Sequence, residues 1–250
     1  MSQDVERTLG LISRKMDHLR AAVLLQAIGP DRILDLNVFD HPIRMYLPYA
    51  ATDMIQRQIL LSGSLYEAGQ LFRIKKEIAP GSVIVDAGAN IGNHTLFFAI
   101  VCRAERVHAF EPLRITHSIL QKNILINGLS NVTTHNMALG AREGSCALFS
   151  FGAENTGSSS FDMATGQDYA VTTIDAMNFE RIDFIKIDVE GNQIPFLEGA
   201  QQTLRRLRPR IWIELHRKKG EYEPADAALR DLGYRQQYAL SESDFVYAPA

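Results

Sequence analysis

The sequence predicts an α/β fold built on a doubly wound, mostly parallel sheet. From residue 83 to residue 216, short apolar runs bounded by turn residues alternate with segments of helix length. This alternation is typical of parallel βαβ units. The chain has 250 residues, of which 46% are hydrophobic and 22% charged. That composition suits an ordinary globular protein with a buried core.

The first 55 residues are expected to form an extension of one helix and one hairpin. In the predicted helix, residues 4–27, six apolar residues recur at alternating steps of four and three. They are Val5, Leu9, Ile12, Met16, Leu19 and Val23. Such a stripe either docks on the body of the protein, which is the simpler interpretation, or forms a homodimer contact. Residues 33–47 alternate around a turn at 40–42 and predict a hairpin that covers one edge of the fold.

The remaining elements are expected within one domain, residues 56–250. A mostly helical stretch, 53–78, is broken at 62–64. Strands are expected at 83–87, 106–110, 131–139, 182–189 and 210–216, and helices at 93–102, 113–127 and 193–207. The tail predicts an antiparallel hairpin of residues 234–239 and 245–248 at the sheet edge. The Gly- and Ser-rich segment Gly152–Gln167 is either a surface connection or a substrate lid.

Charge and cysteine content exclude several classes of protein. Lys and Arg number 26 against 29 Asp and Glu, a formal net charge of −3, which lacks the concentrated positive charge of a nucleic-acid binder. Two cysteines, Cys102 and Cys146, are too few for a disulfide framework or a four-cysteine zinc site. No apolar run approaches the ~20 residues of a membrane span, and the first residues lack the features of a signal peptide. We therefore expect a cytoplasmic protein with no nucleic-acid partner.

A glycine loop follows the strand at 83–87. Gly88 and Gly92 allow positive φ, and the next residues, Asn93 to Thr95, begin a helix whose free N–H groups can bind an anion. The dinucleotide fingerprint G-x-G-x-x-G needs further glycines where this chain has Asn90 and Asn93. Pyrophosphate is therefore a poor candidate for the ligand.

Two acidic residues indicate a different ligand. Asp86 lies in the strand that precedes the loop, and Glu111 ends the next strand within Phe110-Glu111-Pro112. An acid beside a helix N-terminus matches a ligand that carries both an ammonium and a carboxylate group. A carboxylate at the end of the second strand can accept both hydroxyls of an adenosine ribose. S-adenosyl-L-methionine has all of these groups.

Residues 66–216 resemble the FkbM family of S-adenosylmethionine-dependent O-methyltransferases. The matching positions are Tyr66-Glu67, Asp86 to Gly92, Phe110-Glu111-Pro112, Asn123 with Asn127, Ala138-Leu139-Gly140, Thr173-Ile174-Asp175, Ile185 to Gly191, Gly199-Ala200 and Glu214-Leu215-His216. The resemblance implies a class I methyltransferase fold, which is Rossmann-like, with a seven-stranded sheet that ends in an antiparallel hairpin. It also implies a cofactor or acceptor contact at Glu67 and contact with adenine at Asn136. Where the family usually carries an acid, this chain has Gln193, so no role is carried over there.

The ends of the last two parallel strands are expected to meet the cofactor. Asp188 and Glu190 share one face of their strand, and Glu214 and His216 share one face of the next. Methyl transfer to a hydroxyl needs positioning and removal of a proton. His216 is either the general base or a structural histidine paired with a glutamate. Glu190 either orients His216 or is itself the base, and Asp188 orients the cofactor or the acceptor.

The residues thus predict an S-adenosylmethionine-dependent methyltransferase, and the resemblance implies that it acts on a hydroxyl of a sugar, glycan or secondary metabolite. The predicted catalytic residues are His216, Glu190 and Asp188. The predicted cofactor-binding residues are Glu67, Asp86, Gly88, Asn90, Gly92, Asn93, Thr95, Glu111, Pro112, Asn136 and Asp188. A divalent ion on Asp188, Glu190 and His216 has no diagnostic spacing to support it, so no metal is expected.

Two alternatives stay open at this point. One is an N-methyltransferase of nucleic acid or protein. It is disfavoured because Asp188-Val-Glu-Gly stands where such enzymes carry a Pro-Pro-aromatic signature. The other is a non-catalytic adenosylmethionine-binding scaffold that dimerises through the N-terminal helix.

Overall fold

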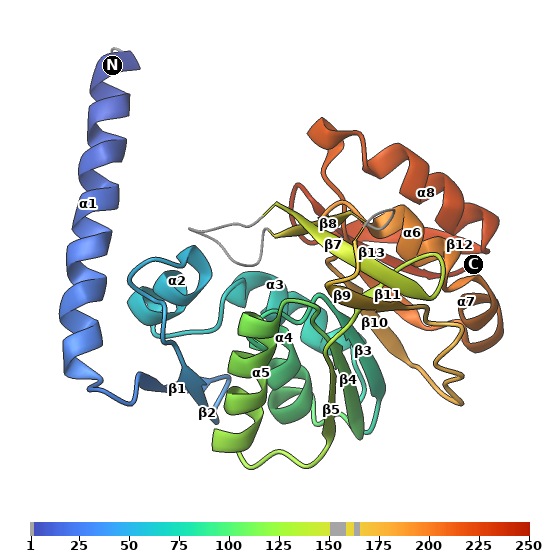
Figure 1. The fold of residues 1–250 in the computed structure, drawn as a ribbon, viewed down its shortest axis with the longest axis horizontal. Helices are drawn as coiled ribbons and strands as arrows, with labels where there is room; N and C mark the ends of the chain where they lie inside the picture. Colours follow the sequence, from blue (N-terminus) through green and yellow to red (C-terminus); the bar gives the residue numbers. More distant parts are fainter. Residues whose placement is uncertain (1–2, 151–158, 163–165) are drawn as a thin grey trace.

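The computed structural model describes residues 3–150, 159–162 and 166–250. Its centre is a seven-stranded sheet in the order β12-β13-β11-β10-β3-β4-β5 (Figure 1). These strands are β3 (Val83–Ala87), β4 (Arg106–Phe110), β5 (Val132–His135), β10 (Phe184–Ile187), β11 (Arg210–Glu214), β12 (Tyr234–Ala239) and β13 (Asp244–Pro249). Strands β5, β4, β3, β10 and β11 are parallel, and β13 is antiparallel to both of its neighbours. The doubly wound sheet with its antiparallel C-terminal hairpin is confirmed.

The strand order reverses between β3 and β10. From β3 the chain builds outward through β4 and β5, and it later continues on the other side of β3 with β10 and β11. In open α/β sheets, ligands bind beyond the carboxyl ends of the strands at such a reversal, where the loops part and leave a crevice. A ligand site is therefore expected between the turn after β3 and the loop after β10.

Helices cover both faces of the sheet. These helices are α2 (Met54–Ser62), α3 (Ala68–Ile74), α4 (Asn93–Leu96), α5 (Arg114–Ile126), α6 (Gln193–Glu198), α7 (Gln201–Leu207) and α8 (Tyr222–Asp231), with short turns η1 (Lys75–Glu77), η2 (Phe97–Val101) and η4 (Arg217–Lys219). The first helix, α1 (Gln3–Ala27), is not among them. Alternation along the strands sends Ile84 and Phe184 into an apolar cluster with α2, α3 and η2. Their neighbours Val85 and Ile185 enter a second cluster with α6, α7 and α8. Burial on both faces explains why the strands are continuously apolar.

The structure differs from the sequence-based prediction at residues 131–139. The expected strand ends at His135, because the side chain of Asn136 donates hydrogen bonds to the carbonyl oxygens of Glu111 (2.9 Å) and Pro112 (2.8 Å) and turns the chain away. The next residues form β6 (Ala138–Leu139) in a separate four-stranded sheet. Its other strands, which the sequence analysis did not predict, are β7 (Gly144–Ser150), β8 (Ser160–Asp162) and β9 (Tyr169–Thr172). Most of the Gly152–Gln167 segment lies outside the described residues.

Two expected helices are also interrupted. The helix predicted at 93–102 is α4 followed by the π-helical turn η2. The helix predicted at 193–207 is divided into α6 and α7 at Gly199, where a Cβ atom would overlap with the carbonyl oxygen of Gly140. The mostly helical stretch at 53–78 is confirmed, and it is broken at Gly63, which has a φ of +63°.

The N-terminal hairpin is confirmed. It forms a two-stranded sheet of its own and is hydrogen-bonded to α5, not to a strand of the main sheet. It consists of β1 (Ile33–Val38) and β2 (His41–Tyr46). The side-chain oxygen of Asn123 accepts a hydrogen bond from the backbone of Tyr46 (2.6 Å), and that of Asn127 accepts one from Arg44 (2.8 Å). Asn123 also donates to the carbonyl of Ile91 in the glycine loop (2.8 Å). These two asparagines join the hairpin, the helix and the loop.

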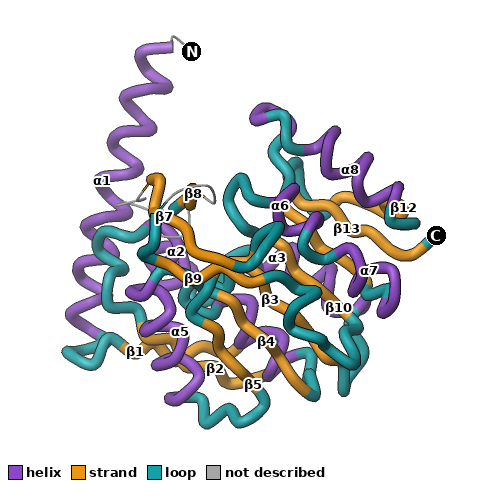
Figure 2. Tube along the Cα trace, turned by 45° about the vertical axis from the view of Figure 1, so that its right-hand side comes forward, coloured by secondary structure: helices purple, strands orange, loops and turns teal. Residues whose placement is uncertain are grey.

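Helix α1 stands away from the rest of the protein (Figures 1 and 2). The six residues of the predicted apolar stripe are 44–69% exposed, so the docking interpretation is wrong for this face. Contact with the body is made near the end of the helix, where Ala21 and Leu25 are buried. Among the described residues, no helix is both long and apolar enough to cross a membrane.

The division of the chain at residue 55 stays a prediction. One apolar cluster continues across that position, because Ile43 of the hairpin, Leu60 of α2 and Ile84 of the central strand all belong to it.

The turn after β3 gives a first test. Gly88 has a φ of +83°, and a Cβ atom there would overlap with the carbonyl oxygen of Asp188. We expect Gly88→Ala to lower the free energy of unfolding by roughly 2–5 kcal/mol, from left-handed strain and overpacking together. The control is Gly69→Ala in α3, where a Cβ atom meets nothing within 4 Å and the change should stabilise by up to about 1 kcal/mol. Urea denaturation measures both. Equal effects would contradict the close approach.

Candidate active site

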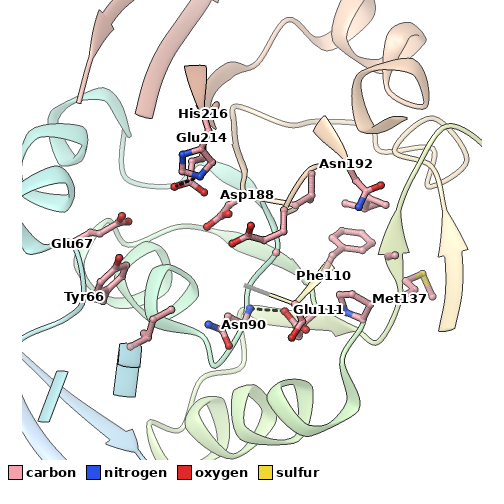
Figure 3. A pocket seen from close by; sticks show the side chains of 18 of the residues that line it. Tyr66, Glu67, Asn90, Phe110, Glu111, Met137, Asp188, Asn192, Glu214 and His216 are labelled. Atoms are coloured by element: carbon pink, nitrogen blue, oxygen red, sulfur yellow. Dashed lines mark hydrogen bonds and ion pairs between the residues drawn. The ribbon is translucent and has the colours of Figure 1, made fainter. Parts of the chain in front are cut away.

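A cavity of about 330 Å³ lies at the carboxyl ends of β3, β4, β10 and β11 (Figure 3). This volume is within the usual range for small-molecule sites. Eight of the residues predicted from sequence line it: Glu67, Gly88, Asn90, Glu111, Pro112, Asp188, Glu190 and His216. Residues outside the predicted catalytic and cofactor-binding sets complete the lining: Ile55, Tyr66, Phe110, Met137, Ala138, Leu139, Ser159, Val189, Asn192, Glu214 and Lys219. The fold thus brings together side chains that are far apart in the sequence.

The glycine turn approaches the cavity with its backbone. Gly88 can pass beside Asp188 because it has no Cβ atom. Asn90, at a φ of +49°, turns its backbone N–H to a carboxylate oxygen of Glu111 at 2.8 Å. The amide oxygen of Asn90 is buried and has no hydrogen-bond partner among the described residues. A buried acceptor at the cavity wall without a partner is a group that a ligand can satisfy.

Glu111 is held rigidly at the end of β4. Its Oε1 accepts hydrogen bonds from the backbone of Leu113 (2.9 Å) and from the hydroxyl of Thr116 (2.8 Å). Its Oε2 accepts the bond from Asn90 and keeps capacity for another donor. The side chain is only 7% exposed, and burial raises the pKa of Glu111 to about 7. A fixed carboxyl of this kind can accept hydrogen bonds from ligand hydroxyls.

An apolar surface lies beside Glu111. It is formed by Phe110, Met137 and Leu139, and the ring of His135 stacks on Phe110 with centroids 4.3 Å apart. Sequence reasoning missed these residues as ligand contacts because apolar side chains next to a strand end normally enter the core. The available signal was their position: Phe110 directly precedes Glu111, and Met137 directly follows Asn136.

Three carboxyl groups converge at the other end of the cavity. Oxygens of Asp188, Glu190 and Glu214 lie within 4.8 Å of one another. Burial by itself would raise the pKa of Asp188, but Lys186, with its Nζ 2.9 Å from Oδ2, holds it below its usual value. Burial and then the charge of Asp188 raise the pKa of Glu214 to about 10 and that of Glu190 to about 7. At neutral pH, Asp188 is therefore ionised, whereas Glu214 is a neutral acid.

These groups are also the described side chains that could hold a divalent cation, as a set of three oxygen ligands. The set contains Glu214 where the sequence analysis had considered His216. The ammonium of Lys186 already supplies a positive charge to Asp188.

His216 lies at the rim of this acidic group. Its Nε2 is 3.6 Å from Glu214, and its side chain is one-third exposed. The backbone N–H of His216 donates to the carboxylate of Glu221 at 2.7 Å, which holds the turn. Lys219, one turn further, places its ammonium 3.8 Å from Glu190. The His216 imidazole and the Glu190 carboxyl, two groups that can accept a proton, thus both line the cavity.

Glu67 faces the cavity from the loop before α3 (Figure 3). Its backbone has a φ of +59°, an uncommon conformation for a residue with a side chain. Burial alone would raise the pKa of Glu67, but a 3.2 Å contact with His94 lowers it. The His94 ring in turn meets the face of Trp212 at 5.1 Å in a T-shaped contact. Glu67 is therefore an ionised group held by His94, which itself packs against Trp212.

Five of the predicted cofactor-binding residues do not line the cavity: Asp86, Gly92, Asn93, Thr95 and Asn136. Asp86 is fully buried and accepts a hydrogen bond from the hydroxyl of Thr95 at 2.6 Å. Its second oxygen has no partner among the described residues. Gly92, at a φ of +94°, precedes α4 and packs against Leu120. Their contribution to binding stays a prediction.

Asn93 holds the loop that carries Glu67. Its side chain accepts a hydrogen bond from the backbone N–H of Tyr66 (2.8 Å) and donates one to the carbonyl of the same residue (3.1 Å). Asn136 is similarly engaged with the backbone after β4, and Met137 reaches the cavity in its place. Both asparagines shape the site from outside it.

Comparison with known proteins identifies the family. Residues 86–236 match the family model described as "Methyltransferase FkbM domain". The chain belongs to the FkbM methyltransferase family. This confirms the resemblance seen in the sequence, and the protein is a methyltransferase with a class I methyltransferase fold.

Curated relatives of this FkbM protein have the same general activity in their names. Methyltransferase 1 of Beauveria bassiana is 27% identical over 188 residues, 63% of this chain and 75% of the relative. Methyltransferase sdnD of Sordaria araneosa is 24% identical over 188 residues, covering 60% of this chain and 73% of the relative. Among solved structures, methyltransferase FkbM of Methylobacillus flagellatus KT has a TM-score of 0.51 at 17% identity. That alignment covers 93% of this chain but 59% of the other, so the likeness concerns the fold alone.

The raised pKa of Glu190 makes the stability of this FkbM protein depend on pH. In the unfolded chain Glu190 ionises at its ordinary pKa of 4.5, and in the folded protein at about 7. The folded state therefore binds more protons between these values, and stability falls as pH rises through this window. As the pH rises from 4.5 to 7, we expect the free energy of unfolding of Glu190→Gln to increase by about 1–3 kcal/mol relative to that of wild type.

Urea denaturation over a pH series measures this difference. The control is Glu198→Gln, which removes an exposed carboxylate from α6, and its difference from wild type should stay nearly constant. A Glu190→Gln curve parallel to that of wild type would contradict the environment described for Glu190.

Proposed function

We propose that this FkbM methyltransferase uses S-adenosylmethionine to methylate a hydroxyl of a sugar, glycan or secondary metabolite. The observation that carries the proposal is the position of Glu111. It lies at the end of the second strand, at hydrogen-bond distance from the glycine turn after the first strand. A carboxyl at this position is the group that accepts the ribose hydroxyls of an adenosine in doubly wound folds.

The rest of the cavity fits the same ligand. Gly88 brings the backbone of the turn to the cavity wall, and the amide oxygen of Asn90 offers an acceptor that still needs a donor. Phe110, Met137 and Leu139 offer an apolar surface for the adenine ring. When bound, S-adenosylmethionine supplies a methyl group on a sulfonium, which is reactive toward an oxygen nucleophile.

Proton removal from the acceptor is assigned to the polar end of the cavity. His216 is our general base, because it is partly exposed, lines the cavity and carries an imidazole, the side chain that most often acts as a general base. Glu214, as a neutral acid 3.6 Å from the imidazole, does not compete with it for the proton. Glu190 is the second acceptor group, because its pKa of about 7 is close to the optimum for a general base at neutral pH. Asp188 orients the acceptor.

Cofactor binding is tested by titration calorimetry with S-adenosylhomocysteine, the demethylated product. We expect Glu111→Gln to weaken binding roughly 100-fold, because an acceptor oxygen is replaced by an NH₂ group that faces the ribose hydroxyls. Glu198→Gln should bind like wild type. Tight binding of NADH in place of S-adenosylhomocysteine would refute the assignment of the cofactor.

Turnover is tested with an isotope-labelled methyl donor and panels of sugars, glycans and hydroxylated metabolites, read by mass spectrometry. With any acceptor found, His216→Ala should lower kcat by roughly 10²–10⁴ while leaving the affinity for S-adenosylhomocysteine within about twofold. An unchanged kcat would remove His216 as the base, and Glu190→Gln in the same assay then tests the second acceptor. Labelling confined to amines of RNA or protein would overturn O-methylation.

A further inference from the structure

Helix α1 carries an apolar stripe that the described part of the protein leaves exposed. Val5, Leu9, Ile12, Met16, Leu19 and Val23 are all between 44% and 69% exposed. Their steps of four and three are the a and d positions of a heptad repeat, with Leu9, Met16 and Val23 at a and Val5, Ile12 and Leu19 at d. Six such positions on a helix of 25 residues form a continuous seam.

The stripe is directed away from the body because the helix docks with its opposite side. Ala21 is fully buried and Leu25 is 7% exposed, and in the same heptad register they fall at f and c, outside the a/d seam. Figures 1 and 2 both show α1 rising from the body with its N-terminal part free. As long as this docking persists, the described part of the chain cannot cover the seam.

We propose that the occupant of this seam is a second copy of the chain, with the two α1 helices packed antiparallel. The alignment that places Val5 against the partner's Val23 also places Leu9 against the partner's Leu19. It places Ile12 against the partner's Met16 as well. Each of the six apolar residues of one helix therefore faces an apolar residue of the other. The stripe is thus complementary to itself under a two-fold rotation, as a closed dimer requires.

The surface of the helix already has a matching depression. A shallow hollow is lined by Leu19, Arg20, Val23 and Leu24. In the antiparallel alignment, Val5 and Leu9 of the partner would lie next to this hollow. A side chain that enters a space between four residues of the facing helix is the packing by which coiled coils are held together.

A parallel pair fits less well. Lys15 at position g would face Arg20 at position e of the other helix, and this like-charge contact would occur twice. The antiparallel alignment leaves one like-charge contact, between the two Lys15 side chains. Leu9 at a with Ile12 at d is also a combination that favours larger parallel bundles over parallel dimers. In addition, the antiparallel pair puts the two bodies at opposite ends.

A membrane surface is the other apolar occupant to consider, and the composition of α1 disfavours it. The helix contains four Lys or Arg and three Asp or Glu, with no Trp, Tyr or Phe. Helices that lie on membranes usually combine a strongly basic face with aromatic residues. Nearly balanced charge beside an aliphatic seam is typical of a protein–protein contact.

Analytical ultracentrifugation of the full chain over a concentration series tests the dimer. Wild type should approach twice the chain mass of 28.0 kDa. Leu9→Glu/Leu19→Glu should raise the dissociation constant roughly 100-fold or more, because charges would enter the seam. The matched control is Leu11→Glu, which is 48% exposed but lies at c, off the seam. It should change the constant by about twofold at most.

Two outcomes overturn the dimer. One is a wild-type mass that stays monomeric across the series, and the other is an equal loss of association in the Leu11 control. Far-UV circular dichroism confirms that each variant is folded, which is expected because all three leucines are exposed. Binding of monomeric wild type to phosphatidylcholine–phosphatidylglycerol vesicles, lost in Leu9→Glu/Leu19→Glu, would assign the stripe to a membrane instead.

Disulfide trapping tests the orientation. A mixture of the Leu9→Cys and Leu19→Cys variants should form a disulfide-linked heterodimer. The Leu9→Cys variant alone should form no disulfide-linked dimer, because its two sulfur atoms would be separated by about ten residues of helix, or ~15 Å. The native cysteines, Cys102 and Cys146, are buried and do not compete. Efficient crosslinking of Leu9→Cys to itself would overturn the antiparallel arrangement.

Discussion

The close approach of the chain at the ends of β3 and β10 is the constraint on which the site depends. The backbone N–H of Asp188 donates to the carbonyl of Ala87 at 3.0 Å, which continues the parallel ladder beyond the strands. The next residue of the first strand must pass directly beside the carbonyl of Asp188, and only Gly88 leaves the space. The turn that follows presents the N–H of Asn90 to Glu111. The turn beside the cavity and its hydrogen bond to Glu111 thus both depend on the missing Cβ atom at Gly88.

The same approach crowds negative charge, and buried positive groups compensate for it. Lys186, 2% exposed, lies beside Asp188 under the cavity. Its ammonium also lies 5.7 Å from the centre of the Trp212 ring. Glu67 has its own partner in His94. Burial and the charge of Asp188 outweigh the effect of Lys186 on Glu214, and Glu214 therefore remains protonated at neutral pH. The protonation states at this end of the cavity follow from the balance between burial, which raises the pKa of each acid, and the neighbouring charges.

Much of the fold and about half of the candidate site could be predicted from residue patterns. Strand-end acids such as Glu111, Asp188 and Glu190 were found because parallel strands end at one edge and side chains alternate along them. The apolar wall of Phe110, Met137 and Leu139 was missed, since nothing local distinguishes a ligand contact from a core residue. The strand expected at 131–139 was too long because the hydrogen bonds that end it connect Asn136 to backbone about 25 residues earlier.

The sequence by itself determined the order of the strands of the main sheet, the positive-φ turn at Gly88 and the heptad of α1, because these depend on the chemistry of neighbouring residues. Only the tertiary structure decided which polar groups face the cavity. Asp86 and Asp188 belong to adjacent strands, yet Asp86 is buried against Thr95 whereas Asp188 lines the cavity. It also decided that α1 docks through Ala21 and Leu25, with its apolar stripe exposed in the part of the chain that the structure describes. Alternation along a strand or helix defines two faces, but only packing against distant parts of the chain determines what each face meets.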